Sequence, residues 1–98
     1  MSNLYLIERN DRCGYDEYDS AVVVADSEEE AKTINPDDNY LWDADVGNWY
    51  GTRLRNGERL YVKYHSWVFP PSVTVTYLGE AESSRLSGEV ICASFNAG

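Results

Sequence analysis

The feature that most constrains the fold of this chain is a series of short, strand-like segments with little room between them for crossover helices. β-Branched and apolar residues concentrate at 4–9, 21–25, 73–78 and 88–95, a composition typical of strands. Parallel neighbours need a connection of about a dozen residues or more, usually a helix. The pattern therefore predicts a mostly antiparallel sheet of four to five strands.

Residues 26–34 carry the clearest helix signal of the chain. Ser27 and Glu30 have the spacing of a capping box, and the glutamates at 28–30 favour the positive end of the helix dipole. Pro36 ends the helix, and Ala31 and Ile34 are its inward residues. We expect an α+β fold, one domain over residues 1–98, with this short helix packed on a face of the sheet.

The middle of the chain has no clear period. Residues 37–56 interleave aromatic and acidic side chains, which predicts a long ordered loop pinned by aromatics, with at most a short strand. Asn56 and Gly57 form a strong two-residue hairpin signal. They predict a turn between residues 54–55 and the strand-like segment 59–64.

The net charge of −9 is concentrated in the first half of the chain. Residues 1–50 carry thirteen acidic and three basic side chains, a net charge of −10, whereas residues 51–98 carry four acidic and five basic ones. Such a field repels phosphates, which opposes direct binding of nucleic acid. Eight tyrosines and three tryptophans nevertheless indicate a folded chain, since acidic disordered segments are poor in aromatics.

The acidic half is the candidate working surface. A rigid protein whose carboxylates match the charge density of DNA can occupy a basic, nucleic-acid-binding groove, and its field steers association. Aromatic side chains would supply the anchors that carboxylates lack. The candidate partner-binding residues are Asp16, Glu17, Asp19, Asp26, Glu28, Glu29, Glu30, Asp37, Asp38, Asp43 and Asp45, with Tyr15, Tyr18 and Trp42 among them.

The alternative to a binding surface is a solvated face that serves only solubility. Successive helical residues point about 100° apart, so the three glutamates at 28–30 cannot all face one partner. The basic cluster of the second half either offsets the acidic side or stacks its stems on neighbouring tyrosines. Its members are Arg53, Arg55, Arg59 and Lys63.

Catalytic and metal chemistry finds little support in the sequence. His65 is the only histidine, and nothing beyond coexistence links it to Cys13 as a base to a nucleophile. Residues 43–47 resemble a calcium loop, but the glycine falls one place early and the closing glutamate is missing. A weak ion held by the aspartates at 37, 38, 43 and 45 is the less favoured interpretation. We expect no enzyme, no metal and no cofactor.

The cysteines and the N-terminus indicate a compartment. Cys13 and Cys92 show no CxxC spacing and are predicted to be free thiols, with Cys92 a small core residue. No signal peptide pattern begins the chain, and no apolar run approaches the roughly 20 residues that span a bilayer. These observations predict a soluble, cytoplasmic protein.

Five segments give the chain a resemblance to a group of small acidic phage and prophage proteins, most of them uncharacterised. They are LYLIER at 4–9, GYDEYDS at 14–20, SEEEA at 27–31, GEA at 79–81 and ASFNAG at 93–98, roughly half of the chain. Phage proteins of this type include anti-CRISPR and other anti-defence inhibitors, some of which mimic DNA. The resemblance implies an inhibitor but transfers no site residue by residue. It suggests a role for the loop at 15–19, whose alternative is a tyrosine-braced hairpin turn.

The leading hypothesis is therefore a phage-encoded anti-defence inhibitor of the anti-CRISPR type. It would act in the bacterial cytoplasm, as a monomer, by binding the basic nucleic-acid-binding surface of a host defence complex. The alternative is a phage accessory or structural protein, a small protein–protein interaction module that uses its sheet edge and aromatics.

Overall fold

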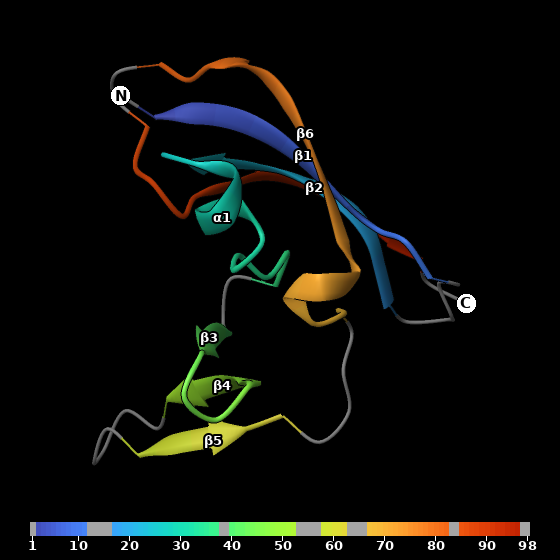
Figure 1. The fold of residues 1–98 in the computed structure, drawn as a ribbon, viewed down its shortest axis with the longest axis vertical. Helices are drawn as coiled ribbons and strands as arrows, with labels where there is room; N and C mark the ends of the chain where they lie inside the picture. The colour runs from blue at the N-terminus through green and yellow to red at the C-terminus, as the bar shows by residue number, and fades with distance from the viewer. Residues whose placement is uncertain are drawn as a thin grey trace.

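The part of the chain that the structure describes forms two antiparallel β-sheets, one short α-helix and one 3-10 turn (Figure 1). The computed structural model describes residues 2–11, 17–37, 40–52, 58–62, 67–82 and 85–96. The larger sheet has the strand order β6-β1-β2-β7, made of β1 (Asn3–Arg9), β2 (Glu17–Ala25), β6 (Val73–Glu80) and β7 (Val90–Asn96). The smaller sheet has the order β3-β4-β5, made of β3 (Leu41–Asp43), β4 (Asn48–Thr52) and β5 (Arg59–Tyr61).

The register of the larger sheet places most of its buried side chains on one face, while Val24, which is also buried, points to the other. Tyr5 of β1 is opposite Val23 of β2, and Ile7 is opposite Ala21. All four side chains are buried, because alternate residues of a strand point to the same side. This face is concave, and α1 (Glu28–Ala31) lies within the concavity (Figure 1).

A single hydrophobic core joins the two sheets. Trp49 of β4 and Trp67, which precedes the 3-10 turn η1 (Pro70–Ser72), are each 1 % exposed. Both belong to the same buried cluster as Tyr5, Ile7 and Val23 of the larger sheet. The small sheet therefore completes the core that the concave face and α1 begin.

The helix is capped as the sequence predicts. The Ser27 hydroxyl accepts a hydrogen bond from the Glu30 N–H at 3.2 Å, and the Glu30 carboxylate accepts from the Asp26 N–H at 3.4 Å. Ala31 and Ile34 are both buried in the core, also as predicted. The α-helix ends at Ala31, so it is one turn long. In the described part of the chain, no helix is long and apolar enough to cross a membrane.

The antiparallel pairing and the single short helix are confirmed, but the prediction of one sheet is wrong. Residues 37–56, interpreted as a loop, contain β3 and β4 as a tight hairpin. The Asp43 carboxylate accepts from the N–H groups of Asp45 and Val46, and Gly47 adopts a φ of 76°. β3 has three residues and β4 has five, too few to leave a strong period in the sequence, and the turn between them is built by side chain–backbone bonds.

The hairpin predicted at Asn56 and Gly57 is only partly open to comparison. β4 and β5 pair in antiparallel fashion, with Gly51 opposite Leu60. The turn residues 53–57 lie outside the described residues. The antiparallel pairing of the flanking strands agrees with the prediction. Their register does not, because a two-residue turn at Asn56 and Gly57 would place Thr52 opposite Tyr61, whereas Thr52 lies opposite Arg59.

Candidate functional site

One end of the larger sheet gathers carboxylates from three segments of the chain. Asn3, at the start of β1, is opposite Ala25 at the end of β2 and Glu80 at the end of β6. The Val24 N–H donates to the carbonyl of Glu89, just before β7. Seven carboxylates lie at this end, here called the acidic end: Asp26, Glu28, Glu29, Glu30, Glu80, Glu82 and Glu89.

Most of the acidic end is open to solvent. Five of its seven carboxylate residues are exposed, and Glu30 and Glu89 are partly buried. Two cations lie among them in the described chain, Lys32 at the C-cap of α1 and Arg85. Seven carboxylates against two cations leave a formal net charge of −5.

Hydrogen bonds hold the acidic end together. The Ser87 hydroxyl donates to Glu30, and the Ser2 hydroxyl donates to Asp26 at 3.0 Å. Arg85 pairs with Glu89 at 2.7 Å and lies 3.8 Å from Glu82. The segment before β7 is thereby fastened to α1 and to its own turn.

Sequence reasoning identified four of the seven carboxylates of this surface. Asp26 and the three helix glutamates were predicted as partner-binding residues, and the structure brings them together. Glu80, Glu82 and Glu89 were missed, because they belong to the second half of the chain, whose net charge is nearly neutral. The strand ends on which they lie meet α1 only through the antiparallel order β6-β1-β2-β7.

Other predicted residues lie at the opposite end of the same sheet. Glu17, Tyr18 and Asp19 begin β2, beside Arg9 at the end of β1. The seven residues of β1 span roughly 20 Å at about 3.3 Å per residue. The predicted continuous acidic face is therefore divided between two ends of the sheet.

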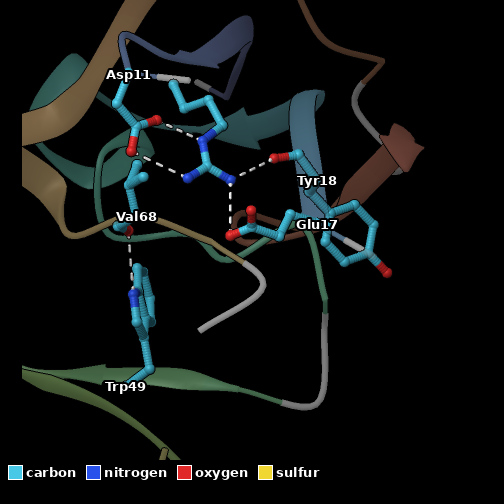
Figure 2. Close-up of polar contacts among 6 residues, drawn as sticks. Asp11, Glu17, Tyr18, Trp49 and Val68 are labelled. Carbon is cyan, nitrogen blue, oxygen red and sulfur yellow. Dashed lines mark hydrogen bonds and ion pairs between the residues drawn. The ribbon is translucent and has the colours of Figure 1, made fainter. Parts of the chain in front are cut away.

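Arg9 organises this second group of polar residues (Figure 2). Its side chain is 7 % exposed and donates to both oxygens of Asp11, at 2.5 and 3.0 Å. Its Nη1 donates to the Tyr18 carbonyl at 3.2 Å and lies 3.5 Å from the Glu17 carboxylate. Mainly through these hydrogen bonds, Arg9 holds the pKa of Asp11 below its ordinary value.

Asp43, also predicted to bind a partner, is structural. It is 6 % exposed, and its Oδ2 accepts from the Tyr61 hydroxyl and from Arg59 Nη1, each at 2.7 Å. The hydrogen bond from Tyr61, followed by those from Val46 and Arg59, holds the pKa of Asp43 below its ordinary value. Because Asp43 is buried, it cannot belong to an exposed binding surface. Asp45 in the same turn is exposed.

The predicted role of the basic cluster holds for its one described member. Arg59 pairs with Asp43, and its guanidinium lies 4.4 Å from the centre of the Tyr50 ring. It therefore both offsets an acidic residue and stacks on a tyrosine. The other three basic residues lie outside the described chain: Arg53, Arg55 and Lys63.

The Trp42 side chain packs against other aromatic rings of the protein more than it is exposed to a binding partner. It is half-buried, and its ring centre lies 5.0 Å from that of Trp49 and 5.8 Å from that of Phe69. Asp37 is also half-buried, and its N–H donates to the side chain of Asn35. The remaining candidates, Tyr15, Asp16 and Asp38, fall outside the described residues, as do Cys13 and His65.

Cys92 does not occupy the core, so that prediction is wrong. It is exposed and lies opposite Val22, on the face of the sheet away from Val23. No three His, Cys, Asp or Glu side chains gather as metal ligands within the described ranges.

Comparison of the chain with protein-family models, curated proteins and solved structures finds no match. The resemblance to phage proteins therefore stays a prediction.

Proposed function

We propose that this protein is a non-enzymatic inhibitor of the anti-CRISPR type, which binds the basic nucleic-acid-binding surface of a host defence complex through its acidic end. The observation that carries the proposal is the gathering of seven carboxylates from three segments, one of which contains α1. A basic groove built to meet DNA phosphates attracts such a surface over long range. The acidic end would therefore compete with DNA for the groove.

The rigidity of the acidic end supports this role. The segment before β7 is fastened to β2 by two main-chain hydrogen bonds, from Gly88 N–H to Val24 and from Val24 N–H to Glu89. The capping box fixes the start of α1. A surface that is already ordered loses less conformational entropy on binding.

An apolar contact is also available beside the carboxylates. Leu86 is 78 % exposed, and its carbonyl accepts from the Glu89 N–H, which places it within the acidic end. Charges at an interface give steering and specificity more than affinity, so a central apolar anchor is expected. Leu86 replaces the predicted Trp42 in that role.

The test is competition on purified CRISPR effector complexes loaded with labelled duplex DNA. We expect the protein to reduce DNA binding at low salt and to lose this effect at about 0.5 M NaCl, where the Debye length is only about 4 Å. A Glu28→Lys/Glu29→Lys variant should inhibit at least tenfold less, since two reversed charges weaken a steered contact strongly.

The matched control reverses two exposed charges away from the acidic end, in a Glu8→Lys/Asp45→Lys variant. Glu8 and Asp45 are both exposed. Circular dichroism should confirm that both variants are folded. An equal loss of inhibition in the two variants, or inhibition that does not change with salt concentration, would contradict the acidic end as the binding surface.

A second candidate function rests on the edges of the larger sheet. In the described part of the chain, β6 and β7 are its outermost strands, and β7 contains no charged residue. Uncharged edges readily pair with another strand, which suits an accessory interaction module. Light scattering distinguishes the two: a dimer that Ser94→Lys disrupts and Glu28→Lys/Glu29→Lys preserves would favour this alternative.

A further inference from the structure

An open cavity of about 290 Å³ lies at the opposite end of the larger sheet from the acidic end. Its lining includes three charged residues, Arg9, Asp11 and Glu17, here called the charged wall, and two aromatic residues, Trp67 and Phe69, here called the aromatic wall. This volume is close to the lower limit of about 300 Å³ for small-ligand pockets. The cavity suits one side chain or a fragment better than a larger ligand.

The charged wall does not favour an anion. The guanidinium of Arg9 has five N–H donors, and it already donates to both Asp11 oxygens and to the Tyr18 carbonyl. Its Nη1 also faces the Glu17 carboxylate at 3.5 Å. Among the described residues of this wall, one guanidinium and two carboxylates give a formal charge of −1.

The two carboxylates remain open to the cavity side and to solvent. The Asp11 side chain is 49 % exposed and that of Glu17 is 26 % exposed, whereas Arg9 beneath them is 7 % exposed. A carboxylate accepts several hydrogen bonds at once. The wall therefore presents acceptors and negative charge to an occupant.

The aromatic wall selects among cations. Phe69 is 41 % exposed, and a planar guanidinium stacks on an aromatic face while pairing with carboxylates in two places. A lysine ammonium is a strongly hydrated point charge and gains less from such a wall. The chemistry of both walls thus fits arginine.

From this arrangement we propose that the cavity binds the side chain of a single arginine, with its guanidinium at Asp11 and Glu17 and its plane against Phe69. The site is separate from the acidic end, roughly 20 Å away along β1. It does not depend on the proposed inhibition. A basic partner that reached both ends would place one arginine here.

Trp67 provides a reporter for the cavity. It lines the cavity, and its buried Nε1 has no hydrogen-bond partner among the described residues. Buried N–H groups nearly always have an acceptor, and this one has none in the described chain. We therefore expect its chemical shift to change when an acceptor or a charge arrives nearby. Its signal is separable from those of Trp42 and Trp49 by NMR assignment.

The experiment titrates N-acetyl-arginine amide into the full chain and follows the Trp67 indole N–H by NMR. The matched probe is N-acetyl-citrulline amide, which has the same shape without the charge. We expect the arginine probe alone to shift the resonance saturably. Glu17→Gln, which keeps an acceptor for Arg9, should raise the Kd of the arginine probe roughly two- to fivefold. Phe69→Ala should raise this Kd by a larger factor than Glu17→Gln does.

Glu8→Gln is the control, because Glu8 is exposed on the opposite face of β1 from Arg9. It should leave the Kd unchanged, as should Glu28→Lys/Glu29→Lys at the distant acidic end. Equal binding of the citrulline probe would overturn the proposal, and so would an unchanged Kd in Glu17→Gln. A shift produced by acetate ions and not by the arginine probe would instead identify an anion site at Arg9.

Discussion

The indole N–H of Trp49 donates a hydrogen bond to the main-chain carbonyl of Val68 at 3.2 Å (Figure 2). Trp49 lies in β4 of the small sheet, whereas Val68 precedes η1 and β6 of the larger sheet. Trp67, next to Val68, is buried in the same core. This contact fastens the small sheet to the chain that leads into the larger one.

Replacement of Trp49 should therefore affect the whole molecule. We expect Trp49→Phe to lower the free energy of unfolding by about 1–3 kcal/mol, from the lost hydrogen bond and the lost volume. Urea denaturation followed by far-ultraviolet circular dichroism and by tryptophan fluorescence should give one coincident transition. Val46→Ala, at a 58 % exposed position, is the control and should change stability by less than about 0.5 kcal/mol. Separate transitions would show that the sheets unfold independently.

Asp43 should be far more important to stability than Asp45, two residues away. Asp43→Ala leaves Tyr61, Arg59 and two turn N–H groups without their acceptor. We expect it to lower Tm by roughly 5–15 °C, measured by thermal denaturation. Asp45→Ala removes an exposed carboxylate and should shift Tm by only about 2 °C or less. Similar shifts in both variants would contradict a structural role for Asp43.

Stability should fall in acid because two carboxyl groups have lowered pKa values. Tyr61, Val46 and Arg59 lower the pKa of Asp43, and Arg9 lowers that of Asp11. A group with a lowered folded-state pKa stabilises the protein above its unfolded-state pKa of about 3.9, and this contribution disappears as the pH falls through the folded-state value. Urea denaturation between about pH 6 and pH 2 measures the effect.

The Asp43→Asn variant supplies the comparison for this pH dependence. Its stability should be lower than that of the wild type near neutral pH and should decline less steeply below about pH 4, because one of the two groups no longer titrates. An unchanged slope would mean that the Asp43 carboxylate has similar pKa values in the folded and unfolded states.

Cys92 should react without unfolding. It is exposed on β7, so in a Cys13→Ser background a thiol reagent should label the native protein at a rate within about tenfold of the unfolded chain. Mass spectrometry after brief labelling measures this rate, and Cys92→Ser should abolish the signal. Labelling that requires denaturant would show that Cys92 is buried in the native protein.

Local signals in the sequence predicted much of the larger sheet and the helix. The apolar segments at 4–9 and 73–78 correspond to β1 and β6, and the capping box at Ser27 forms as expected. The small sheet was missed because β3 and β4 are short, and because their turn is built by the Asp43 side chain. An aspartate between aromatics is as consistent with a solvated loop as with a turn that it organises itself.

What the sequence by itself determined are features whose causes lie within a few residues: strand alternation, helix capping, chain punctuation and the charge of each half. Only the tertiary structure decided which strand ends meet, so that Glu80, Glu82 and Glu89 join the helix carboxylates while Glu17 and Asp19 lie at the far end of the sheet. It also decided that Asp43 is buried. The physical reason is that pairing and burial arise from contacts between segments distant in the chain, and composition does not record their order.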